Sequence, residues 1–120
     1  MIWEHFDAGQ AGEVTVTDGY RTYGCVYEIG EVTTGRQRVF SRYFIRVTLP
    51  DGTLEIGEDQ HSVRSALMNV ATKLSARNLR LMAVGASLGF GETGLSWNSG
   101  WGYVDGCSKA VHMMSEAASR

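Results

Sequence analysis

The segment from Arg38 to Leu49 is the longest stretch in which apolar and polar residues alternate, and it constrains the fold more than any other. Alternation with period two places successive side chains on opposite faces of a strand. Pro50-Asp51-Gly52 follows as a turn, in which proline presets φ and glycine takes the left-handed position. Residues 53–56 are expected to pair back on the long strand. One face of that strand carries its apolar side chains, with Ser41 as the polar interruption: Val39, Tyr43, Ile45, Val47 and Leu49.

An earlier hairpin is predicted at Asp18-Gly19, which follows the alternating residues 13–17. An Asp-Gly pair between alternating segments is typical of a type I′ turn, because that turn needs positive φ at both central positions. The returning strand presents Tyr23, Cys25, Tyr27 and Ile29 on one face, and residues 30–35 are expected to turn the chain again. The first half of the chain therefore predicts antiparallel strands joined by short local turns.

A helix is predicted over residues 59–77, where apolar residues recur at helical spacing. Asp59 or Ser62 is the expected N-cap, Asn78 ends the helix, and Glu58 and Asp59 are expected to favour its N-terminal dipole. Residues 79–86 predict a buried strand, residues 95–98 and 101–104 a hairpin, and residues 107–118 a second helix with an apolar stripe. The predicted fold is a single α+β domain over residues 1–120, a mainly antiparallel sheet with two helices (about 59–77 and 107–118) packed on one face.

Composition and charge exclude several classes of protein. The chain has 120 residues and a net charge of −2, which argues against a uniformly basic nucleic-acid binder. It contains no apolar run of membrane-spanning length, and its first residues are not those of a signal peptide. Two cysteines, Cys25 and Cys107, are too few for a disulfide framework. We therefore expect a cytoplasmic protein with no membrane partner.

Residues 85–106 hold seven glycines and four aromatic residues, and they contain two strings known from enzymes. Residues 85–89 spell G-x-S-x-G around Ser87, and residues 89–94 spell G-x-G-x-x-G. Both motifs need a helix directly afterwards, and the glycines of residues 89–94 do not support one. A small hydrolase that uses Ser87 with Asp105 and His112 is therefore a disfavoured alternative. We expect no enzyme, no cofactor and no metal site, since the three histidines have no ligand pattern around them.

The even positions of the long strand carry the second feature with chemical content: Arg36, Arg38, Phe40, Arg42, Phe44 and Arg46. Three interpretations remain open. The phenylalanines pack inward while the arginines pair with acids such as Glu13, Glu28, Glu31 or Glu55 across the sheet. Alternatively, the stripe is a protein interface, since arginine and aromatic residues dominate interface hot spots. The least favoured interpretation is a surface for single-stranded nucleic acid.

With no catalytic pattern, surface recognition is the expected function. We expect a small protein-binding or regulatory domain, of the kind found among phage or mobile-element inhibitors of bacterial defence systems (anti-CRISPR-type) and immunity proteins. A protein is the favoured partner, nucleic acid is the alternative, and a homodimer through an open sheet edge is a third arrangement. The candidate binding residues are the six of the stripe together with Phe90, Trp97, Trp101 and Tyr103.

Overall fold

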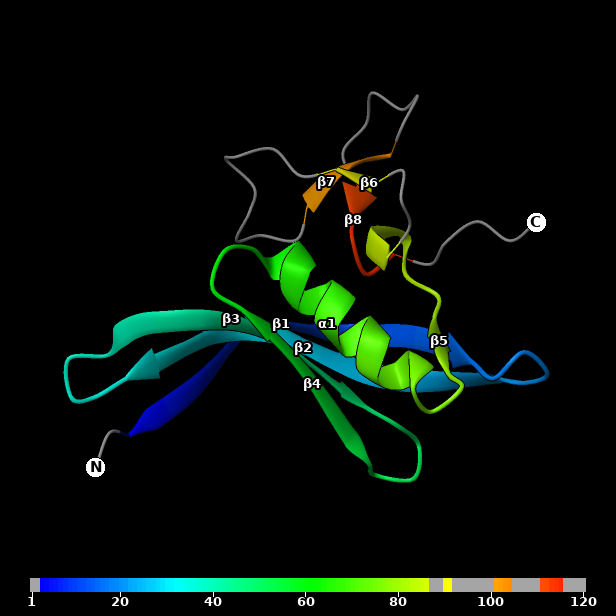
Figure 1. The fold of residues 1–120 in the computed structure, drawn as a ribbon, viewed down its shortest axis with the longest axis horizontal. Coiled ribbons are helices and arrows are strands. Elements are labelled where there is room, and N and C mark those ends of the chain that lie inside the picture. The colour runs from blue at the N-terminus through cyan, green and yellow to red at the C-terminus, as the bar shows by residue number, and fades with distance from the viewer. Residues whose placement is uncertain (1–2, 87–89, 92–100, 105–110, 116–120) are drawn as a thin grey trace.

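A strongly curled antiparallel sheet forms most of the fold, in the computed structural model shown in Figure 1. The structure describes residues 3–86, 90–91, 101–104 and 111–115. The sheet has the order β4-β3-β2-β1-β5, in which the four long strands follow one another as neighbours. The predicted α+β class with local antiparallel connections is therefore confirmed. The strands are β1 (Glu4–Thr17), β2 (Thr22–Thr34), β3 (Val39–Thr48), β4 (Leu54–Asp59) and β5 (Arg80–Leu81).

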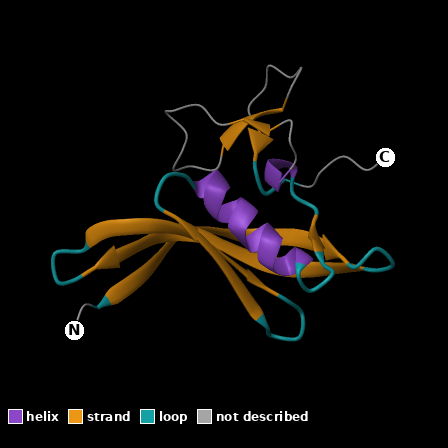
Figure 2. Ribbon diagram, in the orientation of Figure 1, coloured by secondary structure: helices purple, strands orange, loops and turns teal. Residues whose placement is uncertain are grey.

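One α-helix, α1 (Val63–Ser75), crosses a face of this sheet (Figure 2). Its buried residues are those at helical spacing, and they meet the inward side chains of the strands in one core cluster. The predicted apolar stripe of this helix is thus confirmed. The cluster includes Val14, Val16, Cys25, Ile29, Ile45, Val47, Leu67, Val70 and Leu74.

The helix begins and ends at signals that its sequence carries. The Ser62 side chain accepts a hydrogen bond from the backbone N–H of Ser65, which makes Ser62 the N-cap. Asp59 accepts from the N–H groups of His61 and Ser62, so it shapes the approach to the cap. Asn78 takes a left-handed conformation (φ 60°) just after the helix. The prediction that Glu58 and Asp59 favour the helix dipole is wrong, because both belong to β4 and no acid lies in the first turn.

The first two strands are longer than the sequence predicts. β1 begins at Glu4 rather than near residue 13, and β2 continues to Thr34 through the expected turn at residues 30–35. The two strands pair on both sides of a β-bulge between Ala8 and Gln10, next to Gly30. A Cβ atom on Gly30 would clash with the backbone of Asp7 and Ala8. Gly30 is therefore a close-approach position within a strand, not a turn residue.

The first hairpin is confirmed, but its turn is not type I′. Four residues (18–21) connect β1 and β2, and Gly19 has a positive φ of 97° while Asp18 does not. The Asp18 carboxylate accepts hydrogen bonds from the N–H groups of Tyr20 and Arg21, each at 2.8 Å. These bonds, from Arg21 and Tyr20 in that order, lower the pKa of Asp18. The aspartate therefore organises a longer loop through its side chain.

The helix also closes one edge of the sheet. Gly57 of β4 lets the backbone of α1 approach directly, since a Cβ there would clash with Ala66 and Val70. On the same strand, Lys73 donates to the carbonyl of Ile56 and Asn69 to that of Glu58, both at 2.6 Å. The two side chains thus occupy the backbone carbonyls of Ile56 and Glu58, which another strand would need as acceptors to pair with β4.

The second predicted helix, residues 107–118, is wrong where the structure describes it. Val111–His112 is strand β8, which pairs with β7 (Trp101–Val104) in a small sheet of order β6-β7-β8, and residues 113–115 form a turn. The carbonyl of Met113 accepts from the N–H of Gly85 at 2.8 Å, a tertiary bond that replaces a helical one. Met113 and Met114 are both buried, so burial here does not follow the helical period.

The predicted strand over residues 79–86 is only partly correct. Arg80–Leu81 alone forms strand β5, and Val84–Ala86 is a 3₁₀ turn. Of the predicted hairpin, residues 95–98 lie outside the described residues, and β7 pairs with β6 (Phe90–Gly91) and β8. Within the described ranges, no helix combines the length and apolar character that crossing a membrane requires.

Candidate functional site

The arginine stripe of β3 is split between the two faces of the sheet. Val32 of β2 lies opposite Arg42, whereas the next residue, Thr33, lies opposite Phe40, so Ser41 is an extra residue in β3. This bulge reverses the alternation on its two sides. Phe40 consequently shares a face with Tyr43, and their ring centroids are 4.8 Å apart. The bulge also separates Val39 from the apolar face that the sequence predicts for it.

Arg42 is held by acids from two other strands. Its Nε donates to Glu58 of β4 and its Nη1 to Glu4 of β1, both at 2.8 Å. The hydrogen bond to Glu4 raises the pKa of Arg42, against the opposing effect of burial, and the same bond lowers the pKa of Glu4. Arg42 therefore links β1 to β4 across the two strands between them.

Phe44 is fully buried although it lies outside the main core cluster. The ring of Phe6 packs edge-on against it, with centroids 5.2 Å apart. The guanidinium of Arg46 lies over Phe44 (5.6 Å) and that of Arg42 over Phe6 (5.9 Å). These side chains form a small packed cluster on the face away from α1, so Phe44 offers no surface to a partner.

Two further arginines of the stripe also have acid partners. Arg46 bonds to Glu28, the residue directly opposite it on β2, at 2.6 Å. Arg38 bonds to Asp7 at 3.2 Å, and both of these side chains are more than half exposed. Glu28 is one of the acids that the sequence predicts for this pairing. The excess positive charge of residues 36–46 is thus balanced by acids from β1, β2 and β4, which weakens its attraction for phosphate groups.

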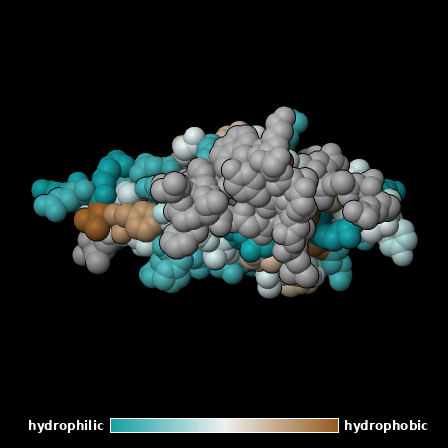
Figure 3. Space-filling model, turned by 90° about the horizontal axis from the view of Figure 1, so that it is seen from above, coloured by the Kyte–Doolittle hydropathy of each residue, from teal (hydrophilic) through white to brown (hydrophobic). Residues whose placement is uncertain are grey.

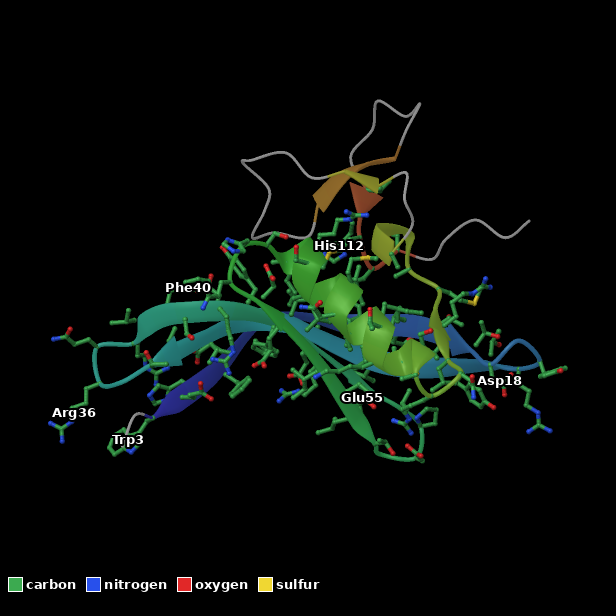
Figure 4. The ribbon with its side chains drawn as sticks, in the orientation of Figure 1. Trp3, Asp18, Arg36, Phe40, Glu55 and His112 are labelled. Carbon is green, nitrogen blue, oxygen red and sulfur yellow. The ribbon has the colours of Figure 1, made fainter. Side chains whose placement is uncertain are left out.

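Arg36 differs from the other arginines of the stripe. It lies in the β2–β3 turn, its side chain is exposed, and it makes no ion pair with another residue that the structure describes. Figure 4 shows Arg36 directed away from the sheet, at the same end of the molecule as Trp3 and Phe40.

Exposed apolar side chains gather at this end of the sheet. Trp3 is 55% exposed, Val39 58% and Phe40 42%. Their strands adjoin here, because the carbonyl of Trp3 accepts from the N–H of Gly35, and Val39 and Phe40 lie opposite Thr34 and Thr33. Figure 3 shows apolar surface at this end beside hydrophilic surface. We call Trp3, Arg36, Arg38, Val39 and Phe40 the hairpin-end surface.

Sequence reasoning found only part of this surface. Arg36, Arg38 and Phe40 belong to the predicted stripe, but Trp3 and Val39 do not appear among the predicted binding residues. Trp3 was missed because the segment before residue 13 shows no alternation, and Val39 because the Ser41 bulge moves it off the core face. A lone tryptophan before an exposed strand was the one signal in the sequence.

The structure describes only part of the glycine-rich segment, residues 85–106. Phe90, Trp101 and Tyr103 lie on β6 and β7, where Phe90 is opposite Val104 and Gly91 opposite Tyr103. Trp97 and Ser87 lie outside the described residues. The structure therefore places the backbone of three predicted binding residues in one small sheet.

His112 is arranged for a structural contact. Its Nδ1 accepts from the N–H of Met114 at 3.2 Å, so Nε2 carries the proton and donates to Gln10 at 2.7 Å. Its ring stacks on Tyr27 with a centroid distance of 6.3 Å, and burial lowers its pKa. A catalytic-triad histidine donates from Nδ1 instead. His112 thus joins the small sheet to the large one.

Other kinds of site find little support in the described residues. They contain no group of three or more metal-ligating side chains close enough to hold an ion. A cavity of about 190 Å³ lies beside the bulge of β1, with Asp7, Glu31 and Tyr43 among its lining residues. It is smaller than typical small-molecule sites of about 300–1,000 Å³. Asp7 is also already bonded to Arg38 and Thr33, so we assign the cavity no ligand.

Comparison of the chain with protein-family models, with curated proteins and with solved structures found no match.

Proposed function

We propose that this chain is a recognition domain that binds another protein through the hairpin-end surface. The observation that carries the proposal is the group of exposed aromatic and apolar side chains at one end of the sheet, beside an arginine that makes no ion pair with any residue in the described ranges. Tryptophan and arginine are the residues most enriched at the energetic centres of interfaces. Trp3, Val39 and Phe40 each keep 40% or more of their surface exposed at one end of the sheet, and grouped exposed apolar side chains are typical of interaction sites.

The charges favour an acidic partner surface. Arg36 has no described acid to neutralise it, and Arg38 is bonded only to the exposed Asp7. An acidic patch beside an apolar pocket on the partner would match both the charge and the aromatic side chains, and such complementarity increases the association rate and the specificity. Inhibition of a bacterial defence system, or neutralisation of a toxin in the cytoplasm, is the form that we propose for this binding.

The test is affinity purification from the host cell with three forms of the protein. A partner should be retained by the unaltered chain, lost with Arg36→Glu/Phe40→Ser, and retained with Tyr20→Ser. Tyr20 is 96% exposed at the opposite hairpin and serves as the matched control. Retention of the partner by the Arg36→Glu/Phe40→Ser variant would overturn the proposal. Arg36→Glu alone should weaken binding without affecting the fold, since its side chain has no described contact.

The two other surfaces predicted from the sequence need their own tests. Alanine at Trp97 and Trp101 should leave the binding unchanged if the hairpin-end surface is the site. A gel shift with single-stranded and duplex oligonucleotides at low salt tests the nucleic-acid alternative, which requires binding that is strongly salt-dependent.

A further inference from the structure

The two edges of the five-stranded sheet differ in how far their outward backbone groups are covered. At β4, side chains of α1 occupy the outward carbonyls of Ile56 and Glu58. At the other edge, β5 pairs with β1 only at Val16 and Thr17. The rest of β1, residues 4–14, has no strand on that side among the residues that the structure describes. It also contains no lysine and no proline, two of the usual protections of an edge strand.

The direction of the backbone groups along this edge follows from two hydrogen bonds. The carbonyl of Thr15 accepts a hydrogen bond from the N–H of Met82, so it points to the edge side. Carbonyls two residues apart in a strand point the same way, so those of Ala11 and Glu13 also point to the edge. The carbonyl of Trp3 accepts from Gly35 on the β2 side, so Glu4, Phe6 and Ala8 point to the edge. The bulge between Ala8 and Gln10 accounts for the change from even to odd positions. Among the described residues, no backbone group forms a hydrogen bond on the edge side with any of these five: Glu4, Phe6, Ala8, Ala11 and Glu13.

We propose that this edge pairs with the same edge of a second copy of the chain, antiparallel, about a twofold axis between Gly9 and Gln10. In this register Ala8 of one copy lies opposite Ala11 of the other, and Phe6 lies opposite Glu13. The backbone N–H and C=O groups that one strand directs toward the edge therefore face the same groups of the other strand, as an antiparallel ladder requires.

Side-chain size and charge fit the same register. Ala8, Gly9 and Ala11 are small and exposed at its centre, and an added Cβ on Gly9 meets no atom within 4 Å. Within residues 6–13, which lie clear of β5, Asp7 falls opposite Gly12 and Glu13 opposite Phe6, so no two acids face each other. Like charges directly opposite would destabilise the pairing. A strand rich in acids thus becomes self-complementary in this register.

The first experiment is sedimentation equilibrium of the full chain over a wide range of concentration, where a monomer–dimer equilibrium is expected. A chain that stays monomeric throughout overturns the proposal. So does a dimer that Phe40→Ser disrupts while substitutions at the β1 edge do not, because that result places the contact at the hairpin-end surface.

A charge exchange then tests the register. Ala8→Lys/Ala11→Lys sets lysine against lysine twice across the twofold axis, and dimerisation should weaken by about tenfold. Ala8→Lys/Ala11→Glu sets lysine against glutamate twice, and dimerisation should recover to at least that of the unaltered chain. The control Tyr20→Lys/Leu54→Lys adds the same charge at exposed positions away from the edge and should have little effect. Equal dimerisation of the two edge variants would overturn the register.

Discussion

Replacing Gly57 with alanine should loosen the contact between α1 and the sheet. A Cβ atom at this position of β4 would clash with the carbonyl of Ala66 and the N–H of Val70, and it would lie 2.8 Å from the Cβ of Val70. Ordinary van der Waals contact begins at 3.4 Å, so the Cβ of Val70 alone would have to move about 0.6 Å away from the new Cβ atom. Since two of the three atoms belong to the helix backbone, a side-chain rotation cannot relieve the clash and the helix must move.

The size of the effect follows from what the helix buries. An outward shift of α1 disturbs the packing of Val63, Ala66, Leu67, Val70 and Leu74, all buried in the core. Overpacking in cores costs about 1–3 kcal/mol. We expect the upper end, about 3 kcal/mol of unfolding free energy, because the backbone of a packed helix yields less than a flexible side chain. That is a large part of the roughly 5–15 kcal/mol that stabilises a domain.

Urea unfolding followed by circular dichroism measures the difference. The control is Gly24→Ala, at an exposed position of β2 where an added Cβ meets no atom within 4 Å. Its unfolding free energy should change by less than about 0.5 kcal/mol. If both variants unfold at the same urea midpoint, the helix does not rest on Gly57 as the structure indicates.

Three further predictions concern the bulge, the helix cap and the link between the sheets. Gly30→Ala should cost about 2–3 kcal/mol in the same assay, because its Cβ meets the β1 backbone at the bulge; a change as small as that of Gly24→Ala would contradict this. Ser62→Ala removes the acceptor for the N–H of Ser65 and should cost about 1 kcal/mol, with Ser62→Asp largely restoring the loss. Burial lowers the pKa of His112 below its ordinary 6.5, so the unfolded chain takes up a proton before the folded one does. The unfolding free energy should therefore fall as the pH drops below about 6.5, and His112→Gln should show a weaker fall over the same range; equal pH dependence would show that the ring is not buried in its neutral form.

The sequence by itself determined the elements whose signals are local. The apolar spacing of α1 and its Ser62 cap, the Pro50-Asp51-Gly52 turn, and the alternation of Tyr43 to Leu49 all appear as predicted. Each depends on interactions within a few residues, where side-chain period and turn chemistry decide the conformation. The class of the fold follows from their order along the chain.

Only the tertiary structure decided the features that depend on distant partners. Residues 4–12 form a strand because β2 continues beside them, and Gly30 is a strand residue because the β1 backbone presses on it. Residues 111–115 pair with β7 and bond to Gly85 instead of forming a helix. The exposure of Val39 has the same kind of origin, because the bulge at Ser41 moves Val39 off the apolar face and places Phe40 on the face of Tyr43. A bulge shifts every side chain beyond it by half a period, and the alternation of the sequence alone does not reveal where it falls.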